Sequence, residues 1–272
     1  AKLGLDDLGM PTKITERWDT VITRPHGILL VTGPTGSGKS TTLYASLNRV
    51  VSESVKAITI EDPVEYHVEG VNQIQVNTAT DMTFAAGLRA ILRHDPDIIM
   101  IGEIRDLETA EAAVQASLTG HLVFSTLHTN DAASATTRLL DMGIEPFLVA
   151  SSVEAILAQR LVRRTCGSCM RRREMTAAEL PEGLEPPADG MVVEAVGCRE
   201  CRRTGFRGRV GAFELLRLTD SIRELIVNRA DATRIRKASH AEGELDLLRD
   251  AAWDLVRAGV TTPAEAMRVI RI

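Results

Sequence analysis

Residues 33–41, GPTGSGKST, have the glycine spacing and the lysine–hydroxyl pair of a phosphate-binding loop, and they follow an apolar β-branched run. Glycines let successive backbone amides point at phosphate oxygens, and the following helix N-terminus adds partial positive charge. We expect Lys39 to reach the β- and γ-phosphates of ATP and the Ser40 hydroxyl to bind Mg²⁺. The alternative is a glycine-rich turn that only begins a helix. The predicted nucleotide-binding residues are Gly33, Pro34, Thr35, Gly36, Ser37, Gly38, Lys39, Ser40 and Thr41.

The segment DIIMIGEIRD, residues 97–106, carries Gly102 and Glu103 directly after a short apolar run. Hydrolases with a phosphate loop usually have an aspartate here that binds Mg²⁺. The acidic group on the metal side must therefore come from elsewhere in the chain. Glu103 is then free to orient or deprotonate the water that attacks the γ-phosphate.

All four cysteines of the chain fall in two Cys-x-x-Cys pairs, CGSC and CREC, which are separated by 28 residues. Four thiolates in such pairs are typical of a structural zinc site, because they close the coordination shell of the metal. Isolated core cysteines and a redox pair are the alternatives. The predicted Zn²⁺ ligands are Cys166, Cys169, Cys198 and Cys201.

Short β-branched runs alternate with amphipathic stretches in the first half of the chain. The expected strands are 28–31, 57–60, 98–101 and 122–126, and helices are expected near 83–93 and 107–118. This alternation predicts an α/β fold in which helices cover both faces of a parallel sheet. Ligands of such sheets bind at the carboxyl ends of the strands, so the polar residues after these runs are candidates for the site.

Several acidic and histidine side chains stand at these strand ends. Glu61, Asp62 and Glu65 follow the second expected strand, His128 follows the fourth, and His121 precedes the fourth. We expect Glu61 and Asp62 to supply the negative charge on the metal side. A solvated strand end is the alternative for the two acids, and a structural or exposed role is the alternative for His128.

The composition is that of a folded protein, with 272 residues, 44% hydrophobic content and a net charge of −5. This charge argues against a surface that coats nucleic acid, and the longest apolar runs are too short to span a bilayer. No export signal is visible, so we expect a cytoplasmic protein.

We expect four segments along the chain. They are a linker from a missing N-terminal domain at 1–26, the nucleotide-binding core at 27–160, the tetracysteine module at 161–210 and a helical C-terminal subdomain at 211–272. In the last segment, Ser221 with Glu224 and Thr262 with Glu265 have the spacing of helix capping boxes.

The quoted segments, together with TIEDPVEY and GHLVFSTLHTNDA, closely resemble the type II/type IV secretion ATPase family over residues 8–272. In that family's terms they look like a Walker A loop, an aspartate box, an atypical Walker B motif and a histidine box. The resemblance implies a RecA-like P-loop NTPase core. It also implies a catalytic role for Glu103, an acidic box of Glu61, Asp62 and Glu65, and histidine-box roles for His121 and for His128, which would sense the γ-phosphate.

By the same resemblance, the chain is an ATPase motor that forms a homo-hexamer. Such a motor lies in the cytoplasm, docks on platform proteins of the bacterial inner membrane and drives pseudopilus or pilus assembly. The segments RPHGILLVTGPTGSGKSTTLYASL and AILAQRLVRR look more like the type II secretion branch than like pilus assembly. The family's preceding domain supplies arginines to the nucleotide site, whereas Arg89, Arg93 and Arg105 of this chain lie among acidic groups and are expected to pair locally.

Two other classes of function stay open at this point. One is a DNA-dependent RecA-like translocase whose zinc module and arginines grip DNA, and the other is a regulatory nucleotide-binding switch. The arginine run at 171–173 has few aromatic side chains nearby that could stack on bases, so nucleic acid is not the expected partner.

Overall fold

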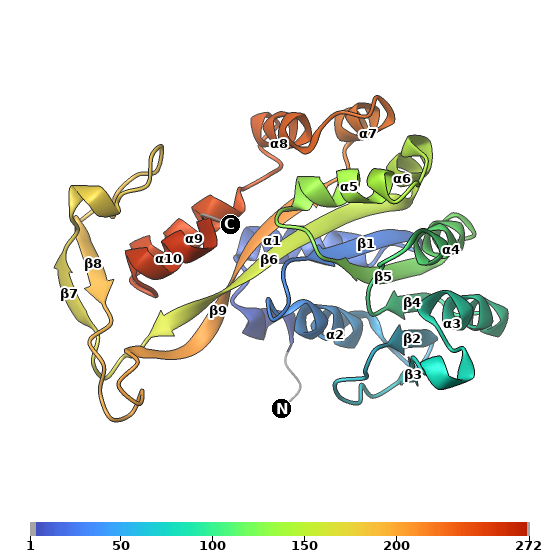
Figure 1. Ribbon diagram of the computed structural model, residues 1–272, viewed down its shortest axis with the longest axis horizontal. Coiled ribbons are helices and arrows are strands. Elements are labelled where there is room, and N and C mark those ends of the chain that lie inside the picture. Colours follow the sequence, from blue (N-terminus) through green and yellow to red (C-terminus); the bar gives the residue numbers. More distant parts are fainter. Residues whose placement is uncertain (1–3, 271–272) are drawn as a thin grey trace.

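The computed structural model describes residues 4–270, and its centre is a seven-stranded sheet in the order β3-β2-β4-β5-β1-β6-β9 (Figure 1). Six strands are parallel, and β9 pairs antiparallel with β6. The predicted α/β fold with a mostly parallel sheet is confirmed. The strands are β1 (Gly27–Thr32), β2 (Ala57–Glu61), β3 (Val71–Gln75), β4 (Ile98–Ile101), β5 (Leu122–Leu127), β6 (Val153–Thr165) and β9 (Phe206–Arg217), with β7 (Arg171–Glu174) and β8 (Met191–Glu194) in a separate two-stranded sheet.

Ten α-helices connect and cover these strands in the described part of the chain. They are α1 (Thr12–Ile22), α2 (Lys39–Val50), α3 (Phe84–Ile91), α4 (Leu107–Leu118), α5 (Ala132–Asp141), α6 (Pro146–Ser152), α7 (Asp220–Val227), α8 (Ala232–Ala241), α9 (Leu248–Arg257) and α10 (Pro263–Ile270). Short 3-10 turns lie at Leu5–Leu8, Thr78–Thr80, Leu92–His94 and Ala177–Glu179. Between residues 4 and 270, no helix is long and apolar enough to cross a membrane.

The sheet is buried on both faces, as expected for parallel strands. Successive residues of β1 point into different clusters: Leu30 packs with α3 to α8, and Leu29 packs with α1 and α2. Trp18 of α1 is fully buried in the second cluster, and its indole Nε1 donates to Ser46 Oγ of α2 at 2.9 Å. Both helical layers therefore fix the position of β1 and of the loop that follows it.

The strands β6 and β9 form a long antiparallel ribbon that leaves the main sheet and leads to the tetracysteine region and the β7–β8 hairpin (Figure 1). Both strands run across the places where the sequence suggested domain boundaries, 160/161 and 210/211. The C-terminal helices pack in two pairs: α7 and α8 lie on α5 and α6, whereas α9 and α10 lie on the ribbon. One continuous ribbon thus connects the half of the chain that holds the phosphate-loop segment with the cysteines.

Helix α7 begins earlier than its predicted capping box. Thr219 is the N-cap, and its Oγ1 accepts a hydrogen bond from the backbone N–H of Ile222. Ser221 Oγ instead donates to the Glu242 carboxylate. The predicted cap at Ser221 is wrong because Thr219 has the same capping chemistry two residues earlier.

Helix α10 is tied to β6 by a buried carboxylate. Thr262 Oγ1 accepts from the Glu265 N–H at 3.2 Å, as the predicted cap requires, but the Glu265 carboxylate accepts from Arg163 and Arg268 instead of reaching back to Thr262. Burial would raise the pKa of Glu265, but hydrogen bonds from Arg163 and Arg268 outweigh burial and lower the pKa to about 2. Glu265 is therefore ionised and holds the last helix on the ribbon.

We predict that Glu265→Gln lowers the free energy of unfolding by roughly 1–3 kcal/mol at pH 7, because charge-assisted hydrogen bonds to a buried group are lost. The pKa of Glu265 lies below its ordinary value of 4.5, so its contribution is complete above about pH 4.5 and disappears as the pH falls toward 2. Urea unfolding at pH 7 and at about pH 3, between the two pKa values, measures both effects. The matched control is Glu111→Gln, on an exposed position of α4. Equal losses in the two variants would contradict the assignment.

Candidate nucleotide-binding site

A cavity of about 590 Å³ lies at the carboxyl ends of β1, β2, β4 and β5. The phosphate-loop segment lines one side, the acidic segment after β2 lines another, and the ends of β4 and β5 complete it. Of the predicted nucleotide-binding residues, Gly33, Pro34 and Ser37 build the loop behind the cavity surface. The others line it: Thr35, Gly36, Gly38, Lys39, Ser40 and Thr41.

The loop conformation depends on glycine. Gly36 and Gly38 have φ angles of 77° and 89°, in the left-handed region that other residues rarely adopt. Lys39 is buried at the first position of α2, and its Nζ donates to the carbonyl oxygens of Gly33 and Pro34 at 3.0 Å each. Burial lowers the pKa of Lys39, and the nearby charge of Glu103 opposes that effect.

Glu103 and His128 meet from the ends of two neighbouring strands. His128 Nε2 lies 3.0 Å from Glu103 Oε2, and Arg105 forms an ion pair with the other carboxylate oxygen. Burial would raise the pKa of Glu103, but hydrogen bonds and charge from Arg105 and His128 outweigh burial and lower the pKa. The Glu103 carboxylate is therefore ionised in the cavity, where it can attract a cation or accept a proton from a nearby water.

Glu61 is the last residue of β2, and its side chain is held inside the protein. Its Oε1 accepts from Thr59 Oγ1 at 2.6 Å and from Gln73 Nε2 at 3.1 Å, and its Oε2 accepts from the Tyr44 hydroxyl. Burial and this hydrogen bond to Glu61 raise the pKa of Tyr44. Both Glu61 oxygens thus have protein donors, which tie the acidic segment to α2.

The other two acidic residues of this segment face solvent. Asp62 and Glu65 are exposed and line the cavity. The chain turns between them, and the peptide bond from Asp62 to Pro63 is cis. The Tyr66 ring packs edge-on against Tyr44, with 4.5 Å between the ring centroids. Asp62 and Glu65 are therefore the acidic-box carboxylates that are accessible to a metal ion in this arrangement.

His121 lies away from the cavity. It precedes β5, so it is at the opposite end of the strand from His128, and its Nδ1 is 2.9 Å from the carbonyl oxygen of Ala116. The structure brings only the second of the two predicted histidines to Glu103. The reason is the length of β5, because six strand residues separate two positions by about 20 Å.

Sequence reasoning missed several cavity residues, and the two most distant from any motif are Leu161 of β6 and Arg209 of β9. No local motif marks them, because they arrive through the antiparallel ribbon. Of the three arginines expected to pair locally, Arg105 pairs with Glu103, Arg89 pairs with Glu108 at 2.7 Å, and Arg93 donates to the Arg89 carbonyl oxygen.

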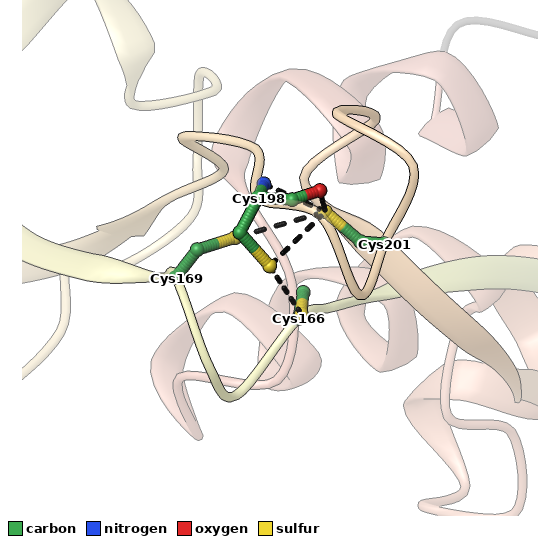
Figure 2. Close-up of side chains that lie close together, drawn as sticks. All are labelled: Cys166, Cys169, Cys198 and Cys201. Carbon is green, nitrogen blue, oxygen red and sulfur yellow. Dashed lines mark hydrogen bonds between the residues drawn. The ribbon is translucent and has the colours of Figure 1, made fainter.

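The four cysteines form a compact cluster at the far end of the ribbon (Figure 2). Their Sγ atoms all lie within 4.8 Å of one another, with 3.9 Å between Cys166 and Cys198 and 3.8 Å from Cys201 to both Cys169 and Cys198. Disulfides need about 2.05 Å. Four thiolates at about 2.3 Å from a tetrahedral zinc ion would be about 3.8 Å apart, so the cluster fits Zn²⁺.

Backbone amides surround the cysteine sulfurs. Cys201 Sγ accepts from the N–H groups of Cys198 and Gly205, at 3.1 and 3.2 Å, and Cys169 Sγ accepts from the N–H of Gly197 at 3.3 Å. The hydrogen bond from Cys198 lowers the pKa of Cys201 to about 6. These amides orient the sulfurs and favour the thiolate form of Cys201, which is the form that binds a metal, whereas burial and hydrogen bonds with the other thiols raise the pKa of Cys169.

Comparison with known proteins assigns the chain to a family. The model of the family described as Type II/IV secretion system protein matches residues 1–268. Type II secretion system protein E of Pseudomonas aeruginosa is 52% identical over 271 residues, covering 99% of this chain and 54% of the relative. The type IV pilus assembly ATPase TfpB of Acinetobacter baylyi is 44% identical over 97% of this chain and 46% of its own length. The chain thus spans about half the length of these relatives.

A solved structure has the same fold. The pilus retraction motor PilT, described with bound ADP, superposes with a TM-score of 0.74 at 32% identity, over 99% of this chain and 67% of that one. The sequence of this chain is therefore similar to that of a type II secretion system protein, and its fold is similar to that of a pilus retraction motor.

We predict that the purified chain holds one Zn²⁺ ion per molecule and that its removal unfolds the β7–β8 region locally, because a site of this kind stabilises its own fold. Elemental analysis, thiol titration and amide hydrogen exchange with and without a chelator measure these effects. Cys198→Ser should lose the metal, whereas Ser168→Ala, between the first two cysteines, should keep it. Free thiols together with unchanged hydrogen exchange in chelator would contradict the site.

Proposed function

The chain belongs to the type II/IV secretion system protein family, and on that premise we propose that it is the ATP-hydrolysing part of a motor that powers pseudopilus assembly and protein export in type II secretion. One observation carries the proposal. The phosphate loop, the Glu103–His128 pair and the exposed acids Asp62 and Glu65 line one cavity, although they come from four different strand ends.

Each group has a role that follows from its place. Lys39 and the loop amides bind the phosphates, and Ser40 with the acidic residues supplies oxygen ligands for Mg²⁺, which neutralises phosphate charge when it is bound. Glu103 is ionised, so it can orient the attacking water and accept its proton. His128 contacts Glu103 and is half exposed, so it can respond to the γ-phosphate. The role of Zn²⁺ is structural, because the cysteine cluster is at the far end of the ribbon.

The assembled protein is proposed to be a homo-hexamer in the cytoplasm that is held at the bacterial inner membrane by secretion platform proteins.

Sequence identity favours type II secretion over pilus assembly. The chain is 52% identical to a type II secretion system protein E and 44% identical to a type IV pilus assembly ATPase. Pilus assembly is the second candidate, supported by that 44% relative and by the likeness to PilT. Deletion of the gene in the source bacterium distinguishes them, because type II secretion predicts lost export with intact pili.

A DNA-dependent translocase is disfavoured by the charge of the chain. Around the cysteines, Arg172 pairs with Asp189 and Arg207 pairs with Glu200, whereas Arg171 has no ion pair among the described residues. The formal net charge of the whole chain is −5, so little excess positive charge is present to displace counterions from DNA. ATP turnover that DNA stimulates, and that falls steeply with salt, would overturn the proposed function in favour of a translocase.

We predict that Glu103→Gln keeps Mg-ATP affinity within about threefold but lowers ATP turnover at least about a hundredfold, because size is kept while charge and basicity are lost. Equilibrium nucleotide binding and phosphate release measure the two quantities. Glu108→Gln makes the same chemical change on the exposed side of α4 and should turn over normally. Turnover of Glu103→Gln close to that of the unaltered chain would remove Glu103 from this role.

A further inference from the structure

Gln159 of β6 connects to the phosphate loop from outside the motif. Its Nε2 donates to the backbone carbonyl oxygen of Ser37 at 2.8 Å, and its Oε1 accepts from the Thr42 hydroxyl of α2 at 2.6 Å. The side chain is 2% exposed. A carbonyl oxygen can only accept a hydrogen bond, so the amide group has one orientation that satisfies both partners. The bridge therefore joins the end of the loop to the first turns of α2.

The bridge also sets the direction of a loop amide. Ser37 C=O and Gly38 N–H belong to one planar trans peptide, so they point in opposite directions. Since Gln159 holds the Ser37 carbonyl on the β6 side, the Gly38 N–H is turned away from β6. Gly38 lines the cavity, where such an amide can donate to a phosphate oxygen.

Two loop glycines are needed for this close approach. A Cβ atom on Gly38 would lie 2.7 Å from Gln159 Nε2, and one on Gly33 would lie 2.5 Å from the Gln159 carbonyl oxygen. Both distances are shorter than normal contacts. Gln159 therefore touches the beginning and the end of the loop, and β6 leaves the loop no room to move toward it.

We propose that Gln159 is a positioning residue, which holds the phosphate loop in the conformation that binds the phosphates of the nucleotide. The inference rests on the proposed function, because it assumes that this cavity binds ATP. It extends that function to a strand with no recognised nucleotide motif. The same strand ends at Thr165, directly before Cys166, so the strand that positions the loop also leads to the tetracysteine cluster.

The decisive variant is Gln159→Met, which keeps the approximate volume and removes both hydrogen bonds. We expect its Kd for Mg-ATP to rise roughly tenfold, because two buried hydrogen bonds that order the loop are lost. Thr42→Val keeps its shape, loses one of the two bonds, and should weaken binding roughly threefold. The double variant should bind no more weakly than Gln159→Met alone, since Thr42 acts through Gln159.

The control separates positioning from general stability. Thr136→Val on α5 removes a buried hydrogen bond to the Ala133 carbonyl at a position that does not line the cavity, so it should lower the melting temperature with no change in Kd. All affinities are measured by calorimetry at a temperature where each variant is folded. Unchanged affinity in Gln159→Met would overturn the inference, and Thr42→Val decides in the same way if Gln159→Met does not fold. Lack of ATP binding by the unaltered chain would instead overturn the proposed function, and the inference with it.

Discussion

The pairing of β1 with β5 on one side and β6 on the other is the constraint on which the site depends. Because β5 lies between β1 and β4, the phosphate loop after β1 is flanked by His128 after β5, and Glu103 follows one strand further along. Each strand is short and buried on both faces, so a one-residue shift of register would move its side chains into the wrong one of the two packed clusters. The relative positions of the loop, His128 and Glu103 are thus set by sheet packing, with little freedom left to the loops.

The buried carboxylate of Glu214, on the edge strand β9, connects the sheet to the C-terminal helix α9. Glu214 of β9 accepts from the N–H of Ala132, at the start of α5, and from the N–H of Leu248, at the start of α9. Burial raises the pKa of this carboxyl, while the two amides lower it and the two helix N-termini favour its negative charge. Helix α5 follows the loop that carries His128, so the loop is anchored to the same ribbon that α9 covers.

The ribbon is therefore the common framework of the two halves of the molecule. Through β6 it touches the phosphate loop, through β9 it holds two helix starts, and at its end it carries the cysteine cluster. The ribbon is hydrogen-bonded between Ala155 and Thr165 of β6, so no flexible linker separates the cavity from the cysteine cluster. The ion pairs of the buried Glu265 carboxylate with two half-exposed arginines add the last helix to this unit.

The sequence alone determined the features whose residues lie within a few positions of one another along the chain. The phosphate loop, the two cysteine pairs, the alternating strands and helices of the first half, and Glu103 after an apolar run were all recognisable, because their chemistry lies within a few consecutive positions. Tertiary structure decided the contacts between distant segments. It turned Glu61 inward to Tyr44, left His121 at the other end of β5, brought Leu161 and Arg209 into the cavity and placed Gln159 against the loop. These contacts follow from strand pairing and from which face of a strand is buried, and no local pattern encodes the antiparallel return of β9 onto β6.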